Sequence, residues 1–403
     1  MDVFDRLNFM KQQRIAELIK VHRDGLLKDT LPFWLKHAID HKCGGFFNHL
    51  DQDGTVLNTD KSVWVLGRFT WLMALLYNCV EKRPEWLNTS RRGIEFIEKY
   101  CFDTDGRMFF EVTRDGRPLR KRRYVYAETF GVIAFAEYAL AARDAKRLER
   151  AKQLYKLLVR YYQNPELLPP KFYPQTRQVK CHAMPMILLA TTQQIRKTGN
   201  DALYEEIIDN SLKEIFEDFM CCDKRALFET VGRNGARLDS PEGRCINPGH
   251  AIETSWFIME EGRHRNDKNL IEKGCTILDW SLDRGWDKEY GGILYFVDVE
   301  GKPCEQYEHD MKLWWPHNEA LYACLLAHSL TGKQKYANWY EKIHAWAYAH
   351  FPDKQNKEWF KYLHRDGTIS STVKGSRWEG AFHLPRMQLY CWKLLEEMKK
   401  AGT

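Results

Sequence analysis

Two histidines and two glutamates lie at the predicted starts of helices that are far apart in the chain. The segment NPGHAIETSWF places His250 and Glu253 three residues apart, KLWWPHNEALY carries Glu319 after a proline, and GAFHLPRM carries His383. Residues three apart share one helix face, and histidine can take and give a proton near neutral pH. These four residues are the predicted catalytic residues of a divided acid–base site, although first-turn capping would explain His250 and Glu253 equally well.

An arginine and several aromatic residues occupy comparable positions. KSVWVLGRFTWL places Arg68 inside an otherwise apolar segment. An unpaired buried charge is costly, so Arg68 should either pair with a neighbouring helix or face a substrate oxygen that becomes negative. Aromatic residues make up 13% of the chain, which suits a concave site for sugars as well as it suits a core of large residues. The predicted substrate-binding residues are Arg68, Trp64, Tyr126 and Trp315.

Several common catalytic motifs are missing from the sequence. Its histidines and carboxylates lack the H-E-x-x-H spacing and have no cysteine partners, so no metal site is predicted. The chain also has no G-x-x-x-x-G-K-[ST] loop, no G-x-G-x-x-G after a strand and no G-x-S-x-G elbow. These absences argue against nucleotide-dependent and serine-nucleophile chemistry.

The elements that must position these residues repeat along the chain. Short β-like segments recur from Gly44, Gly106, Lys171, Ala226, Gly291 and Glu358. All but the degenerate third copy place apolar residues before D-G, N-G or E-G, a pattern that predicts β-hairpins. Such internal repetition is typical of arrays of one supersecondary unit.

Between the hairpins the sequence has helical periodicity. Each interval holds one nearly apolar stretch, such as SVWVLGRFTWLMALLYNCV, and one amphipathic stretch, such as RLERAKQLYKLLVRYY. Six helix pairs with a hairpin at one end predict an all-α (α/α)6 barrel, in which inner helices surround a cavity; an open α-solenoid is the alternative. Because no linker or low-complexity stretch divides the chain, residues 1–403 are expected to form one domain.

The composition of the chain indicates which cellular compartment and which partners to expect. A net charge of +6 does not indicate nucleic acid, and the basic run from Arg117 to Tyr124 fits a solvated loop better than an anion site. The 11 cysteines lack framework or zinc spacing, which indicates reduced thiols. The N-terminus MDVFDRLNFM does not resemble a signal peptide, and no run approaches the ~20 apolar residues that span a bilayer. A soluble cytoplasmic protein is expected.

The segments VWVLGRFTWL, NPGHAIETSW, KLWWPHNEALYA, EWFKYLHRDG and KGSRWEGAFHLPRM together resemble the N-acylglucosamine 2-epimerase family, also called renin-binding protein. The resemblance runs from about Gly44 to Met387 and is nearer to the N-acylglucosamine epimerases than to cellobiose 2-epimerases or mannose isomerases. It implies an (α/α)6 barrel and an isomerase that interconverts N-acetylglucosamine and N-acetylmannosamine through proton transfer at C2.

The resemblance also implies roles for individual residues. His250 and His383 would be the two acid–base residues, Glu253 and Glu319 would orient them and hold sugar hydroxyls, and Arg68 would contact the substrate near the enolate oxygen. No cofactor is required, and ATP enters as an effector that is not consumed. A homodimer is a further implication, whereas His182 receives no role.

Three other functions remain open from the sequence. An aldose–ketose isomerase, or a cellobiose or mannose 2-epimerase, would share the histidines. A glycoside hydrolase or lyase would instead use Glu253 and Glu319 as a carboxylate pair. A protein-binding role would be compatible with the helical surface but would not need converging helix starts.

Overall fold

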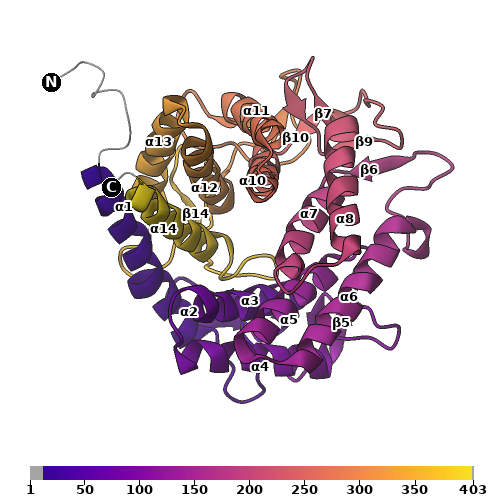
Figure 1. Ribbon diagram of the computed structural model, residues 1–403, viewed down its shortest axis with the longest axis vertical. Coiled ribbons are helices and arrows are strands. Elements are labelled where there is room, and N and C mark those ends of the chain that lie inside the picture. Colours follow the sequence, from indigo (N-terminus) through magenta and orange to yellow (C-terminus); the bar gives the residue numbers. More distant parts are fainter. Residues whose placement is uncertain (1–11, 402–403) are drawn as a thin grey trace.

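Two concentric layers of helices form a ring in the computed structural model, which describes residues 12–401 (Figure 1). The signal-peptide prediction concerns residues that lie outside this range. In the described chain, six inner helices pack on both sides, and at least half of the residues of each are buried. They are α3 (Val63–Cys79), α5 (Tyr126–Ala142), α7 (Ala183–Arg196), α10 (Pro248–Arg265), α12 (Trp314–Thr331) and α14 (His383–Ala401).

An outer helix packs against each inner one, and its apolar stripe alone is buried. Within residues 12–401 the outer helices are α4 (Pro84–Tyr100), α6 (Ala145–Gln163), α8 (Ala202–Glu214), α11 (Lys268–Gly285), α13 (Gln334–His350) and α1 (Gln12–Asp24), which pairs with α14. Shorter helical segments are η2 (Gly25–Thr30), α2 (Leu31–His37), η3 (Pro165–Leu167), η4 (Ile215–Phe219) and α9 (Pro241–Arg244). The predicted (α/α)6 barrel is therefore confirmed.

Short antiparallel sheets gather where the inner helices begin. The pairs are β1 (His49–Leu50) with β2 (Val56–Asn58), β6 (Val179–Cys181) with β9 (Thr230–Gly232), β7 (Met220–Cys221) with β8 (Ala226–Leu227), and β10 (Cys245–Ile246) with β11 (Val297–Asp298). The three-stranded sheets are β3 (Lys61–Ser62), β4 (Glu111–Val112) and β5 (Pro118–Arg120), and β12 (Lys312–Leu313), β13 (Tyr362–Leu363) and β14 (Ile369–Ser371). Several strands lead directly into an inner helix, which fixes where that helix starts.

The hairpin prediction is only partly right. Local hairpins form at β1–β2, β4–β5 and β13–β14, but the segment 171–178 contains no strand. Farther along, β8 forms a hairpin with β7, the strand just before it, whereas β9 and β11 pair with the more distant strands β6 and β10. The E-G turn after β11 does form, since the Gly301 N–H donates to the Asp298 carbonyl oxygen and Gly301 has a φ of 74°. A turn signal thus predicts the turn, whereas the nearest free strand edge decides the partner.

A buried cluster of one carboxylate and two cations anchors the start of α3. Lys61 lies in β3, and its Nζ donates to Asp40 Oδ2 over 3.0 Å and also to the Gly44 carbonyl oxygen. Arg114 binds both oxygens of the same Asp40 carboxylate through its Nε and Nη2 atoms. Since the side chains of Lys61 and Asp40 are fully buried, this pairing is needed to offset their desolvation.

The same cluster recurs across the ring at the start of α12. Lys312 lies in β12 and donates to Asp287 Oδ2 over 2.7 Å and to the Gly291 carbonyl oxygen. Arg365 again binds both oxygens of the aspartate. Two inner helices that carry predicted site residues are therefore anchored by identical chemistry, a repeat that the hairpin pattern did not reveal.

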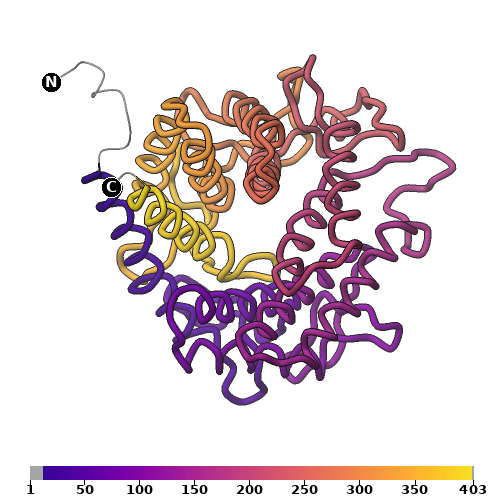
Figure 2. The backbone as a smooth tube through the Cα atoms, viewed as in Figure 1, coloured from indigo at the N-terminus to yellow at the C-terminus, as the bar shows by residue number. Residues whose placement is uncertain are grey.

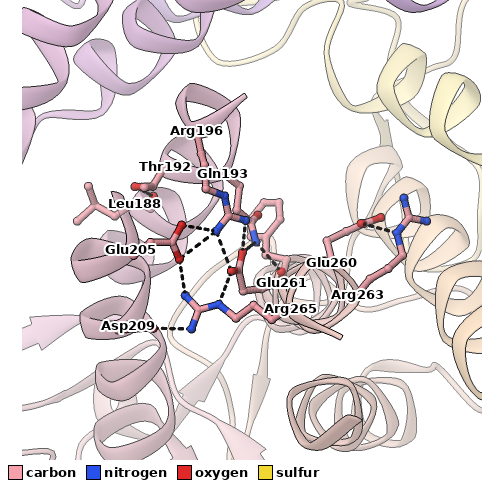
Figure 3. A network of polar contacts seen from close by, with 11 residues as sticks. Leu188, Thr192, Gln193, Arg196, Glu205, Asp209, Glu260, Glu261, Arg263 and Arg265 are labelled. Atoms are coloured by element: carbon pink, nitrogen blue, oxygen red, sulfur yellow. Dashed lines mark hydrogen bonds and ion pairs between the residues drawn. The ribbon is translucent and has the colours of Figure 1, made fainter. Parts of the chain in front are cut away.

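A third ionic network joins the C-terminal ends of α7 and α10 (Figure 3). The fully buried Glu261 accepts from Arg196 through both of its oxygens, and from Gln193 and Arg265. Arg196 and Arg265 also reach Glu205 on α8. The network ties two inner helices to an outer one and closes the wall of the ring at this point.

The ring closes where the first described helix meets the last, α1 beside α14 (Figure 2). His22 of α1 is fully buried, and its ring nitrogens bond to the hydroxyl groups of Tyr340 and Tyr348 on α13. Burial lowers the pKa of His22 to about 3 and that of the neighbouring His344 to about 4. Both imidazoles are therefore neutral in the folded protein near pH 7.

We predict that mild acid destabilises this closure. The pKa of His22 is lower in the folded than in the unfolded state, so the unfolded chain binds more protons below about pH 6.5 and stability falls as the pH falls. Between about pH 7 and pH 5, His22 alone should cost about 2 kcal/mol of unfolding free energy. Urea denaturation at both pH values measures the loss. His22→Gln, which cannot titrate, should lose correspondingly less; an equal loss in both proteins would contradict the assignment.

Candidate active site

A cavity of 1510 Å³ opens among the starts of the inner helices. Seven of the eight predicted site residues line it: Trp64, Arg68, Tyr126, His250, Glu253, Trp315 and His383. The eighth, Glu319, is buried behind His383 and hydrogen-bonds to it. The structure therefore brings together side chains from α3, α5, α10, α12 and α14 that the sequence holds far apart.

The start of α10 sets the position of His250. Asn247 caps the helix, since its side-chain oxygen accepts from the His250 backbone N–H over 3.0 Å, and Pro248 occupies the first turn. Gly249 leaves room for the Trp315 ring, because a Cβ atom there would lie 2.5 Å from it. The Trp315 ring consequently lies beside both histidines, with centroid distances of 5.2 Å to His250 and 5.6 Å to His383.

Glu229 is the carboxylate partner of His250. The two side chains meet over 3.0 Å between His250 Nδ1 and Glu229 Oε2, which leaves His250 Nε2 free. Burial alone would lower the pKa of His250, but the Glu229 charge and hydrogen bond outweigh it and raise that pKa above its usual value. Despite its burial, Glu229 has a pKa well below the usual range because His250 and His182 stabilise its charged form.

His383 has the opposite environment. Its Nδ1 atom lies 2.7 Å from Glu319 Oε1, so Nδ1 donates and Nε2 remains a free acceptor. Burial, reinforced by the positive charges of Arg386 and Arg68, holds the pKa of His383 well below its usual value although Glu253 opposes the shift. One imidazole of the site thus favours the charged form and the other the neutral form, the division of roles that acid–base catalysis requires.

Arg386 connects the carboxylates of the site. Its Nη2 atom donates to Glu253 Oε1 over 2.5 Å and to Glu319 Oε1 over 2.7 Å, and Glu319 Oε2 accepts from Trp256 Nε1. Ligand atoms of Glu253, Glu319 and His383 lie within 4.8 Å of one another, close enough to hold a cation. The guanidinium already supplies the positive charge between these two carboxylates, so this group fits an internal ion pair better than a metal centre.

Arg68 has no ion pair with any described carboxylate, contrary to the salt-bridge alternative. Its Nη1 donates to the Trp378 carbonyl oxygen, and its guanidinium lies 4.2 Å from the centre of the Phe130 ring. Burial lowers the pKa of Arg68 to about 10, and it remains charged near neutral pH. Beside it, Trp64 stacks on Tyr126 with centroids 5.4 Å apart, so one wall of the cavity combines a cation with aromatic faces.

Two further histidines of the inner helix starts do not face the cavity. His317 is buried; its Nδ1 donates to the Leu313 carbonyl oxygen and its Nε2 accepts from the Ile293 N–H, so both ring nitrogens serve the local backbone. His182 is also buried, and its Nε2 lies 3.1 Å from Thr254 Oγ1. In the basic run, residues 118–120 are exposed as expected, but Arg123 reaches the cavity rim.

Sequence reasoning missed Glu229 and Arg386, each of which carries a signal. Glu229 is a lone charge in the apolar segment ALFETV, the argument that selected Arg68. Arg386 follows His383 by three residues, the spacing that selected Glu253 after His250. At the cavity mouth, Glu379 accepts from the hydroxyl groups of Tyr362 and Ser376, and no pattern in the sequence indicated that group.

Comparison with known proteins matches this architecture. The family model for N-acylglucosamine 2-epimerase (GlcNAc 2-epimerase) aligns with residues 45–384. The chain belongs to the N-acylglucosamine 2-epimerase family. N-acylglucosamine 2-epimerase of Bos taurus is 32% identical over 400 residues, which cover 96% of this chain and 94% of that protein. Cellobiose 2-epimerase of Dictyoglomus turgidum is 23% identical over 383 residues, 89% of this chain and 94% of the relative.

A solved structure supports the fold of this epimerase-family chain. Cellobiose 2-epimerase from Bacillus thermoamylovorans superposes with a TM-score of 0.83 at 21% identity, over 95% of this chain and 100% of that one. The predicted family and the prediction of an isomerase of the carbohydrate-epimerase class are thus confirmed. Among the described helices, none is both long and apolar enough for a membrane span.

Replacement of Arg386 should destabilise this epimerase-family fold strongly. Arg386→Met leaves Glu253 and Glu319 buried without their shared cation, and breaking such a buried pair costs about 3 to 5 kcal/mol. Arg263→Met, which removes a more exposed arginine from Glu260, should cost less than about 1 kcal/mol. Urea denaturation compares the two variants. Equal losses would mean that Arg386 is not the central counter-ion.

Proposed function

We propose that the protein interconverts N-acetyl-D-glucosamine and N-acetyl-D-mannosamine by removing and returning the proton at C2. The observation that carries this proposal is that His250 and His383 both lie against the same Trp315 ring at the cavity wall. Each histidine has its own carboxylate and a free Nε2 atom, and their pKa values are shifted in opposite directions. Inversion at one carbon needs a base on one face and an acid on the other, which this pair can supply.

The C2 proton is acidic only beside a free aldehyde, so the sugar ring must open first, with an acid and a base near O5 and O1. A neutral His383 can then accept the C2 proton at Nε2 while the C1–O1 group takes the negative charge of an enolate. His250, whose pKa is raised by its pairing with Glu229, can in its protonated form return a proton to C2 from the opposite face. The reverse reaction exchanges the two roles, and the net proton count of the site is unchanged.

Arg68 fits the role of stabilising the enolate oxygen. It lines the cavity as a cation that forms no ion pair with a carboxylate within residues 12–401, so its charge is available to an oxygen that becomes negative. Glu253 lines the same cavity and can hold a sugar hydroxyl, whereas Glu319 orients His383 from behind. The stacked pair of Trp64 and Tyr126, together with Trp315, offers apolar faces to the sugar.

Two enzymatic alternatives differ in how they would use the site. A glycoside hydrolase needs two carboxylates that flank an open cleft, but Glu253 and Glu319 share one Arg386 nitrogen between them. A cellobiose or mannose 2-epimerase, or an aldose–ketose isomerase, would use the same histidines. The greater identity to the bovine N-acylglucosamine 2-epimerase than to the cellobiose 2-epimerase favours the N-acetylated sugar.

The proposal includes the regulation and environment that the family likeness implies. ATP would act as an effector, supported by four cations that line the cavity, Arg123, Lys171, Arg177 and Arg233. A cytoplasmic location and a homodimer belong to the same proposal. Neither contributes to the chemistry described above.

Proton NMR in D₂O tests the proposed reaction directly. Incubation with N-acetylglucosamine should yield N-acetylmannosamine that carries deuterium at C2, because the proton returned comes from a group that exchanges with solvent. Addition of ATP should raise the rate without loss of ATP. A ketose product would favour the isomerase, and turnover of cellobiose or mannose alone would favour the other epimerases.

Separate replacement of the two histidines tests their roles. His250→Asn and His383→Asn should each lower kcat by at least about 100-fold, since each removes one half of the proton transfer. Far-UV circular dichroism should show an intact helical fold. His264→Asn, which changes an exposed histidine on the same helix as His250, is the matched control. Wild-type rates in both site variants would refute the two-histidine mechanism.

A further inference from the structure

His182 lies behind the His250–Glu229 pair, although the proposed mechanism does not use it. Its side chain is fully buried at the start of α7, and its backbone N–H donates to the Glu229 carbonyl oxygen over 3.0 Å. The ring is held on one side by Thr254 of α10, at 3.1 Å from Nε2, and packs on Phe219. The other nitrogen, Nδ1, points toward Glu229 Oε1 at 3.7 Å and has no hydrogen-bond partner of its own in the described chain.

The Glu229 carboxylate is consequently divided between two imidazoles. Oε2 bonds to His250 Nδ1 at 3.0 Å, and Oε1 faces His182 Nδ1. With its proton on Nδ1, His182 directs an N–H at the carboxylate, while Nε2 accepts from the Thr254 hydroxyl. A carboxylate that serves a second N–H donor holds the proton of its first partner less tightly.

We propose that His182 is a positioning residue that acts through Glu229 to keep His250 an effective proton donor. It fixes the carboxylate with one oxygen for each ring, and it draws charge away from the oxygen that binds His250. When His250 gives its Nε2 proton to C2 of the substrate, its Nδ1 proton stays on the Glu229 side, so no other reactant is needed. The proton-transfer role in this inference rests on the proposed function. The geometry of His182, Glu229 and His250 is independent of it.

Other titratable groups surround His182, Glu229 and His250, and the substitutions at His182 leave them unchanged. Those that face Glu229 from the neighbouring elements are Tyr126, Cys181, Cys245 and Tyr295, and Glu253 faces His250. Except for Glu253, these are groups that are neutral near pH 7. A shift caused by a change at His182 can therefore be assigned to the loss of its donor.

Two substitutions separate the electrostatic role from simple packing. His182→Asn keeps an N–H donor close to the position of Nδ1, facing Glu229. His182→Gln places its amide nearer to the position of Nε2, facing Thr254, and His182→Phe keeps only the ring that packs on Phe219. We expect the alkaline limb of the kcat/KM profile, which reports deprotonation of His250, to move up by about half to one pH unit in the Gln and Phe variants. The Asn variant should keep the wild-type profile.

NMR titration of the enzyme labelled with ¹⁵N-histidine measures the same shift without turnover. The His250 signal is assigned by its loss in His250→Asn, and His344→Phe is the control for removal of a buried imidazole far from the cavity. An upward shift in the Gln and Phe variants, with none in Asn, supports the proposal. An unmoved His250 titration in Phe, a downward shift, or equal behaviour of Asn and Gln would overturn it. Absence of epimerisation by the wild-type enzyme would instead refute the proposed function and leave the titration interpretable.

Discussion

The positive charge of Arg386 is shared between two carboxylates that come from two other helices. Glu253 lies on α10 and Glu319 on α12, and both accept from the same guanidinium nitrogen of α14. Two negative charges could not remain buried at this point without it. The positions of three inner helices are therefore coupled, and the orientation of His383 follows because it bonds to Glu319. The arrangement of the side chains that line the cavity therefore depends on this internal ion pair.

The rest of the architecture keeps His250 and His383, the two histidines of the proposed mechanism, in different environments. The carboxylate beside His250, Glu229, faces the imidazole of His182, whereas the carboxylate beside His383 is shared with the charged guanidinium of Arg386. The same residue type at two helix starts thus acquires opposite protonation preferences from its neighbours. The buried ion pairs of Asp40 and Asp287 anchor the starts of α3 and α12, and Trp315 at the start of α12 lies against both His250 and His383.

Much of the fold could be predicted because its signals are local. Apolar runs and amphipathic runs alternate along the chain, and the two helix layers follow from them. Strand partners were mispredicted at β9 and β11 because their pairing depends on strand edges that the ring brings together from distant parts of the chain. The same distinction applies to the site. Spacing within one helix found Glu253, but the contact between His250 and Glu229 joins separate elements. The partnership of Arg386 with Glu253 crosses an even longer stretch of sequence.

The pairing of α1 with α14 has a consequence for how a newly made chain reaches its active form. Synthesis proceeds from the N-terminus, and earlier segments can fold while later ones are still being made. The apolar stripe of α1, which includes Ile15 and Leu18, gains its inner partner only after every other helix of the ring has been made. The same late helix carries His383 and Arg386. A nascent chain must therefore protect an exposed apolar surface until the segment that completes the active site emerges from the ribosome.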